Sequence, residues 1–409
     1  MNRAITRRLF YYVDIELLSP MSLGNGDATM TDNDLLLDDK GQPFIPGTSI
    51  AGVFQSYQNI SFNTEEDKQS PVYVSDATLN TKDGYKKDIR DGIKLDDEKI
   101  TVDGAKYDFE VVNTGTKFSF RLEIIEREGE DHSFIDDVDQ ALEALACGEI
   151  RFGAKTSRGY GRAKILDVYR KVFTKENLKE YLEFDVMNKE MYDIYEDYKK
   201  KISLENSIMR VSLQQLGGIS IRKYKTTPGE EDFEHIKMNG QSVIPGTSWN
   251  GMLRKQFAYY HKMLGHKESD LDQWFGYVDS KGAQKSKIII DESQIDGGED
   301  LTLTRNKIDR FTGGTVDKAL FKESVHYNGT TQLEIRVPKD NKYIIGIFLL
   351  ILKDIDNGFI ALGGQTSIGR GLFEVKDIFI DEKPYKEDNY EEYRTCLINY
   401  SGEDKNNGK

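Results

Sequence analysis

The sequence predicts an α+β protein made of two tandem ferredoxin-like domains, and repeated motifs are the first reason. Residues 41–52, GQPFIPGTSIAG, return at residues 240–251 as GQSVIPGTSWNG, with eight of twelve positions shared. Residues 153–161, GAKTSRGYG, are echoed at residues 363–371 by GGQTSIGRG. Two matched pairs in the same order indicate a duplication. Its period of about 200 residues is too long for a solenoid repeat, so we expect two domains of one fold.

The order of the predicted elements is the second reason. Each half reads strand, helix, strand, strand, helix, strand, which is the order of a ferredoxin-like domain. Period-2 alternation predicts the strands, and longer periodic segments predict the helices. In the first half these elements lie at residues 9–18, 50–60, 72–79, 118–124, 137–146 and 163–168. In the second half they lie at residues 209–221, 249–264, 288–295, 333–337, 344–356 and 372–375.

Each half also carries a short hairpin and a long insertion. The first hairpin turns at Gly41, and the second at Gly240, which follows an asparagine in the strongest short hairpin signal. In the Pro-Gly-Thr-Ser motif that comes next, we expect Thr48 or Ser49 to cap the helix. Residues 80–106 and 302–318 are insertions with little apolar alternation. Ordered insertions of this length are usually functional, and each is expected to form a hairpin.

These elements set the expected domain boundaries. Residues 1–175 form the first domain and residues 206–388 the second. Residues 176–205, which are charged and rich in tyrosine, are predicted to be a mostly helical connector, and residues 389–409 a polar tail.

Composition excludes several classes of protein. The longest apolar run, residues 344–352, is too short to span a membrane and is predicted to be a buried helix. The basic N-terminus leads into a strand and not into a signal-peptide core. The sequence has only two cysteines, Cys147 and Cys396, which excludes a disulfide framework. We therefore expect a cytoplasmic protein without a membrane partner. Its net charge of -14 argues against a generic nucleic-acid coat, although basic residues gather near the glycine motifs.

The glycine motifs have no Walker spacing and follow a helix, so they are not mononucleotide or dinucleotide loops. Exposed backbone amides beside hydroxyls and cations suit a phosphodiester backbone. The alternative is a tight turn that only packs a helix against a strand. Because Thr-Ser recurs in both copies, phosphate contact is the favoured interpretation.

Asp32 and Asp34 stand at the end of a glycine-rich loop. A carboxylate there could take a proton from a ribose hydroxyl or hold a divalent ion, although most such runs are solvated turns. Residues 305–314, RNKIDRFTGG, combine three cations with one aromatic, which is typical either of contacts to a nucleic-acid strand or of a solvated hairpin. His261 and His266 are predicted to be surface residues, and no histidine pair shows metal-ligand spacing.

Together these motifs resemble the repeat-associated mysterious protein (RAMP) superfamily, specifically the backbone-forming family of type III CRISPR-Cas effector complexes. The resemblance rests on IPGTSIAG and IPGTSWNG, on both glycine loops and on RNKIDRFTGG. It implies a ferredoxin-like core with a thumb hairpin, and a filament of such units that grips a CRISPR RNA and its complementary target. Fusion of two units is similar to the type III-D style of complex.

The resemblance also implies site residues. In target-cleaving members an aspartate ahead of the Pro-Gly motif cuts target RNA with a divalent metal and leaves a 2',3'-cyclic phosphate. By position, the catalytic candidates are Asp32 with Asp34, and Asp232 if one gap is allowed or Glu231 without it. Asp32 is the expected ligand of Mg²⁺ or Mn²⁺. The residues expected to contact RNA are Thr48, Ser49, Lys155, Thr156, Ser157, Arg158, Arg162, Ser248, Arg305, Arg310, Gln365, Thr366, Ser367 and Arg370.

We therefore expect an endoribonuclease subunit whose partners are guide RNA, target RNA, a large polymerase/cyclase-like subunit, a small subunit and further backbone units. The first alternative is a non-catalytic guide-binding scaffold of the same complex. The second is a stand-alone protein that binds single-stranded RNA. Processing of the CRISPR transcript is not expected, because neither half contains a histidine-rich site.

Overall fold

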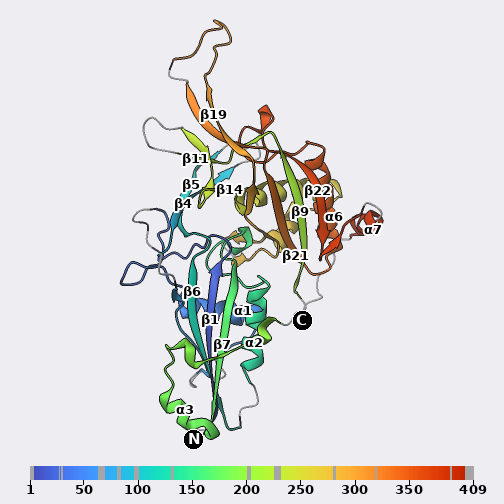
Figure 1. The fold of residues 1–409 in the computed structure, drawn as a ribbon. Helices are drawn as coiled ribbons and strands as arrows, with labels where there is room; N and C mark the ends of the chain where they lie inside the picture. The colour runs from blue at the N-terminus through green and yellow to red at the C-terminus, as the bar shows by residue number, and fades with distance from the viewer. Residues whose placement is uncertain are drawn as a thin grey trace. The chain divides into compact units, whose positions relative to one another are not determined.

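The computed structural model describes residues 4–26, 28, 31–62, 70–80, 84–95, 101–129, 133–199, 204–224, 232–279, 282–317, 320–386 and 389–400. The chain divides into two compact units (Figure 1). The first holds residues 1–156 and 160–204, and the second holds residues 157–159 and 205–409. Among the described residues, no helix combines the length and the apolar character that crossing a membrane requires.

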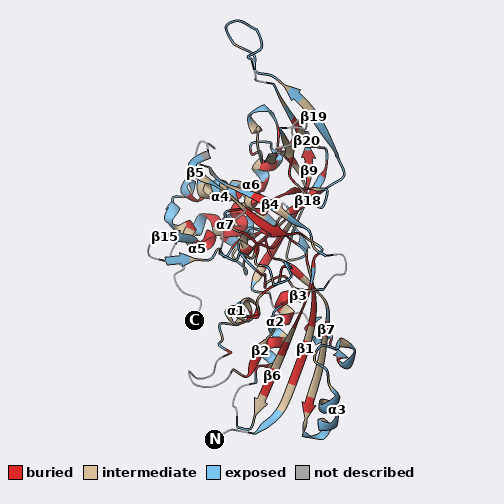
Figure 2. Ribbon diagram, turned by 90° about the vertical axis from the view of Figure 1, so that its left-hand side faces the viewer, coloured by how far each residue is buried: buried red, intermediate tan, exposed pale blue. Residues whose placement is uncertain are grey.

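The first unit is a sheet covered by two helices on one face (Figure 2). The main sheet has the antiparallel order β2-β6-β1-β7, extended by β8. This is the strand order of a ferredoxin-like fold. Its elements are β1 (Ile5–Leu17), α1 (Gly47–Gln58), β2 (Val72–Val74), β3 (Thr78–Leu79), β4 (Lys87–Leu95), β5 (Thr101–Val112), β6 (Lys117–Arg127), α2 (Ile135–Ala146), β7 (Ala163–Thr174), α3 (Leu178–Glu183) and β8 (Asp193–Ile194).

The second unit repeats this order as β18-β21-β9-β22, with β17 also paired to β21. The core elements are β9 (Asn206–Leu216), β14 (Gln241–Ile244), α4 (Gly246–Met263), β17 (Ile289–Ile290), β18 (Ser293–Asp296), β21 (Thr330–Pro338), α6 (Lys342–Asp356) and β22 (Leu372–Ile380). The remaining elements are β10 (Gly218–Ile219), β11 (Arg222–Tyr224), β12 (Phe233–His235), β13 (Lys237–Met238), α5 (Asp272–Phe275), β15 (Tyr277–Asp279), β16 (Gly282–Gln284), β19 (Glu299–Arg305), β20 (Phe321–Tyr327), β23 (Lys383–Pro384) and α7 (Tyr390–Asn399).

Each unit inserts a two-stranded hairpin before the strand that precedes its second long helix, which is β6 in the first unit and β21 in the second. In the first unit β4 pairs with β5, and in the second β19 pairs with β20. Figure 1 shows the β19–β20 hairpin extending away from the sheet of its own unit. Strand β4 and the first half of β5 lie in the first predicted insertion, whereas β19 overlaps the second only over residues 302–305 and β20 begins after it.

The helix start differs from the prediction. Helix α1 begins at Gly47 after Pro46, and neither Thr48 nor Ser49 caps it. The carboxylate of Asp76, which comes after β2, accepts the Gly47 N–H at 2.7 Å. Thr48 and Ser49 therefore lie inside the first turn of the helix and not at its N-cap position, and Thr48 is exposed.

The predicted connector and tail both pack as parts of a unit. Helix α3 covers only six connector residues, and the rest is short turns with β8. Phe184 and Tyr192 pack on Phe10 and Phe173 of the sheet. The predicted polar tail contains α7, whose Leu397 is buried against α6. The sequence-based prediction missed this helix because Leu397 is its one buried position.

Candidate functional site

Asp32 is held against the hairpin of the first unit. Its backbone N–H donates to Asp108 Oδ1 at 3.0 Å, and its own Oδ2 accepts the Asp108 N–H at 2.9 Å. Asp32 is exposed, so this pair of hydrogen bonds holds its carboxylate at the surface next to strand β5. The carboxylate of Asp108 lies beside it.

Asp34 has a different environment. It is buried, and its Oδ1 accepts from the Thr31 N–H at 2.8 Å and the Thr31 hydroxyl at 2.9 Å. These bonds tie the loop together from inside. The structure thus places the predicted neighbour of Asp32 in the loop interior. Residues 31–33 bend, so the two carboxylates do not share one face as residues two apart on a strand would.

Asp232 makes the same contact in the second unit. Its Oδ2 accepts the Lys322 N–H at 2.8 Å, and its N–H donates to the Lys322 carbonyl at 2.9 Å. Lys322 lies on β20, the counterpart of β5. Asp232 is therefore the structural counterpart of Asp32. Glu231, the ungapped match, lies outside the described residues.

Strand pairing explains the one-residue gap. Asp32 lies three residues before Leu35, which bridges to Gly24, and Asp232 lies three before His235, which pairs with Arg222. The extra residue of the first copy falls after this point, in the turn that ends at Gly41. Turns tolerate insertions, so the gap leaves the two aspartates in register.

The glycine loops have one conformation in both units. Lys155 and Gln365 take positive φ values of 57° and 59°, and a short 3-10 turn follows each. A side chain on Gly161 or Gly371 would meet a backbone oxygen at 1.7 or 1.8 Å. The glycines thus serve tight packing, while the residues between them remain on the surface to different extents.

The predicted RNA contacts divide by exposure. The exposed residues are Thr48, Arg158, Arg310 and Ser367. The half-buried ones are Ser49, Lys155, Ser157, Arg162, Ser248, Arg305, Gln365 and Thr366. Thr156 and Arg370 are buried. The side chains of Thr156 and Arg370 pack beneath the loop surface, and a ligand cannot reach them in this conformation.

The hairpin tip of the second unit is an ordered turn with an uncovered aromatic ring. Asp309 Oδ1 accepts from the backbone N–H groups of Phe311 at 2.9 Å and Thr312 at 2.7 Å. These bonds lower the pKa of the Asp309 carboxyl. Phe311 is 98% exposed, and Arg310 beside it is also exposed. A rigid turn that presents a phenyl ring and cations can stack on a base and contact its phosphates.

A buried ion cluster joins this hairpin to the glycine loop of the second unit. Glu323 of β20 has no exposed surface. Its Oε1 accepts from Arg370 Nη2 at 2.7 Å and lies 3.2 Å from Arg305 Nε. Its Oε2 accepts from Gln365 Nε2 at 2.9 Å and lies 4.0 Å from Arg222 Nη2. Sequence inspection missed Glu323 and Arg222, because nothing local marks either residue.

In the first unit, aromatic side chains occupy the positions that correspond to this ion cluster. Phe109 follows Asp108 as Glu323 follows Lys322, and Tyr160 precedes Gly161 as Arg370 precedes Gly371. Phe109 and Tyr160 are buried together, with ring centroids 5.8 Å apart. The Lys155 ammonium lies 3.0 Å from the Phe109 centroid. One unit thus holds its loop by a cation–π contact and the other by an ion cluster.

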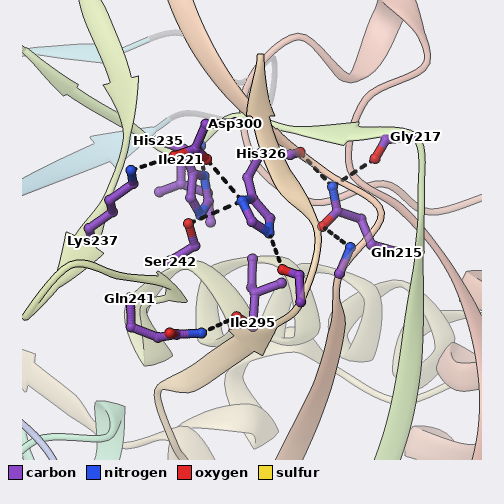
Figure 3. A network of polar contacts seen from close by, with 12 residues as sticks. Gln215, Gly217, Ile221, His235, Lys237, Gln241, Ser242, Ile295, Asp300 and His326 are labelled. Carbon is purple, nitrogen blue, oxygen red and sulfur yellow. Dashed lines mark hydrogen bonds and ion pairs between the residues drawn. The ribbon is translucent and has the colours of Figure 1, made fainter.

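The second unit also contains a histidine network (Figure 3). His326 Nδ1 lies 2.9 Å from Asp300 Oδ1 and 3.2 Å from Ser242 Oγ, while its Nε2 lies 3.1 Å from the Gly297 carbonyl. Lys237 donates to Asp300, and His235 stacks on His326 at 6.0 Å. Lys237, Ser242, Asp300 and His326 line a polar pocket of about 410 Å³. His235 and His326 are 91 positions apart in sequence, so no spacing signal predicted them.

The histidine predicted to lie at the surface near α4 is also buried. His261 has no exposed surface, and its Nδ1 lies 2.7 Å from the Tyr343 hydroxyl. The error arose because aromatic residues cover this end of α4. His266, itself half-buried, stacks on His261, and Trp274 of α5 and Tyr343 of α6 pack edge-on against it.

His235 makes the stability of the second unit dependent on pH. Burial lowers its pKa to about 3, and the charge of His326 adds to the effect. The unfolded state binds a proton near the ordinary pKa of about 6.5 that the folded state rejects. We expect stability to fall as pH drops from about 6.5 towards 3, and to be insensitive to this group above that range.

Unfolding by urea between about pH 4 and pH 7 tests this, with His235→Leu as the comparison because Leu35 is the first-unit counterpart. The variant should lose a slope of up to about 1.4 kcal/mol per pH unit. Parallel profiles for the two proteins would contradict the assignment. His261, whose pKa burial also lowers, is common to both and cancels.

No curated protein matches the sequence. A family model described as the RAMP superfamily matches residues 14–164 and 217–374. The two matched segments cover most of both units and more than half of the chain. They also contain both aspartates, both hairpins and both glycine loops. On this match, the chain belongs to the RAMP superfamily.

Proposed function

We propose that this protein is a tandem backbone subunit of a type III CRISPR-Cas effector complex that binds guide RNA and cleaves complementary target RNA. Family membership and the repeated strand order support this role. Its partners are a large polymerase/cyclase-like subunit, a small subunit and further backbone units, in a complex of the type III-D style. The protein acts in the cytoplasm.

The glycine loops grip the guide, and the hairpins act as thumbs. Arg158 and Ser367 are exposed on equivalent turns, where they reach phosphates. Phe311 at the tip of the β19–β20 hairpin separates two bases of the paired strands by stacking on one of them. A separated base bends the target strand, which in-line attack requires.

The cleavage chemistry belongs to Asp32. The ribose 2'-oxygen attacks the adjacent phosphorus, the bond to the 5'-oxygen breaks, and a 2',3'-cyclic phosphate results. Asp32 takes the proton from the 2'-hydroxyl or orients that group. The observation that carries this assignment is the shared hold of Asp32 and Asp232 on the hairpin strand.

A divalent cation, Mg²⁺ or Mn²⁺, would be held by Asp32 with Asp108 beside it. Carboxylate oxygens fit such ions, which in phosphoryl sites often have only one or two protein ligands and take the rest from water and phosphate. No group of three or more potential ligands occurs among the described residues, which agrees with a site that the RNA completes. When bound, the cation would stabilise charge on the phosphate.

The test is Asp32→Asn in the assembled complex. Asparagine keeps an oxygen that can accept the Asp108 N–H, so the loop stays in place while the base is lost. We expect cleavage at one register to fall by at least about 100-fold, with guide binding unchanged. Labelled target on a denaturing gel measures this. Asp39→Asn, an exposed position in the nearby turn, is the control.

Asp232→Asn asks the same of the second unit, at the other register. Full cleavage by both variants would replace this proposal with a non-catalytic guide-binding scaffold of the same complex. Copurified RNA of random sequence would instead indicate a stand-alone binder of single-stranded RNA.

A further inference from the structure

We propose that the second unit carries a phosphodiester site organised by buried Glu323, in which Arg222 and Arg305 contact the RNA and Arg370 positions them. The first unit has no counterpart of it among its described residues. This inference rests on the proposed RNA binding and goes beyond it, because it makes the two units unequal and names a positioning carboxylate.

Charge balance is the first step. Three guanidinium groups from β11, the end of β19 and the glycine loop surround one carboxylate, so two positive charges are left over. Arg370 Nη1 and Arg222 Nε are buried donors without a hydrogen-bond partner. Buried donors of this kind are costly, so the charged cluster is not the cheapest way to pack this place. An anion bound by the partly exposed Arg222 and Arg305 would balance the leftover positive charge.

Exposure divides the roles. The Arg370 side chain is 4% exposed, whereas Arg222 and Arg305 are 31% and 33% exposed. Arg222 and Arg305 can therefore reach a ligand at the surface while Glu323 holds their inner faces. A planar guanidinium matches phosphate oxygens in a bidentate manner, which a lysine ammonium does not. Phosphate is thus the anion that this arrangement fits.

Aromatic rings place the site on a strand-binding surface. The Arg222 guanidinium lies 4.5 Å from the Phe233 ring, and Phe233 packs edge-on against Phe321 at 6.2 Å. Both rings are partly exposed. A cation fixed over a ring loses less freedom on binding, and the rings offer a base a face to stack on. Phe233 directly follows Asp232, so the site adjoins the second candidate carboxylate.

The comparison between units shows that the cluster is not needed for the fold. The counterparts of Arg222, Glu323 and Arg370 are Gly24, Phe109 and Tyr160. The first unit closes the same loop over the same hairpin strand with these residues. An apolar packing is usually at least as stable as a buried ion cluster. A function in binding explains why the second unit carries the charged version.

The experiment measures how binding of a labelled oligouridylate by the full chain depends on salt. Each phosphate contact in single-stranded RNA contributes about 0.7 to the slope of log affinity against log salt. We expect Arg222→Gln/Arg305→Gln to lower that slope by about 1.4. The control is Arg254→Gln/Arg394→Gln, which removes the same charge from the same unit at residues paired with exposed carboxylates. Unfolding curves check that both proteins fold.

Glu323→Gln separates positioning from bulk charge. If charge alone mattered, removing a carboxylate charge would tighten RNA binding. A positioning role predicts weaker binding, since glutamine keeps one acceptor oxygen but replaces the other with an NH₂ donor where Glu323 now accepts from Gln365 and Arg370. Tighter binding, an unchanged slope in the Arg222/Arg305 variant, or an equal loss in the control would each overturn this inference and leave the proposed function standing. Failure of the unaltered chain to bind RNA in low salt and in the assembled complex would overturn both.

Discussion

Glu323→Ala is expected to lower the free energy of unfolding of the second unit by about 3–5 kcal/mol. Removing the carboxylate leaves the buried Arg370 guanidinium without its ion partner, and two further arginines face it. An unpaired charge in the interior is the costliest product of a single substitution. Urea unfolding measures the change in free energy, and calorimetry separates the unfolding transition of this unit from that of the other.

Glu374→Ala is the matched control for this change. Glu374 pairs with Lys376 at 2.6 Å, but both side chains are nearly half exposed. Surface pairs contribute about 0–1 kcal/mol. If Glu323→Ala lowered the free energy of unfolding no more than Glu374→Ala, the Glu323 ion cluster would not be what holds the second glycine loop on the β19–β20 hairpin.

Gly371→Ala is expected to disable the second glycine loop at a cost of about 2–5 kcal/mol. Gly371 has φ of +75°, and an added Cβ would lie 1.8 Å from the Leu362 carbonyl oxygen. The loop would have to leave the Gly218 carbonyl that the Gly371 N–H now bonds at 2.9 Å. Guide binding should fall along with stability, as measured by filter retention of labelled guide RNA.

Gly369→Ala tests the backbone part of that effect alone. Gly369 also has a positive φ, of +83°, but nothing lies within 4 Å of an added Cβ. Its replacement should cost only about 1–2 kcal/mol of strain. Equal costs at the two positions would mean that close packing does not define the loop.

Local patterns allowed the sheets, most helices and the duplication to be predicted from sequence. Alternation and turn glycines report neighbours within a few residues, so the turns at Gly41 and Gly240 and the 344–356 helix could be predicted. The duplication narrowed the counterpart of Asp32 to Asp232 or Glu231, and the shared contact with the hairpin strand then identified Asp232. The catalytic and metal roles of Asp32 stay predictions.

What sequence did not give depends on contacts over long separations. Asp108 meets Asp32 across 76 positions, and Glu323 meets Arg370 across 47. Asp76 replaced the expected helix cap for the same reason, because it reaches Gly47 from 29 positions away. Strand register decides such pairs, and register emerges only when the sheet is assembled.

The outer side of the second helix is covered in both units by the segment that follows the last long strand. In the first unit Tyr195 donates to Asp139 of α2 at 2.6 Å and Tyr198 is buried nearby; in the second, Leu397 and Tyr400 cover α6. Each unit therefore finishes its own core before its final residues end. The duplicated unit therefore extends beyond its last long strand and includes the segment that covers its second helix.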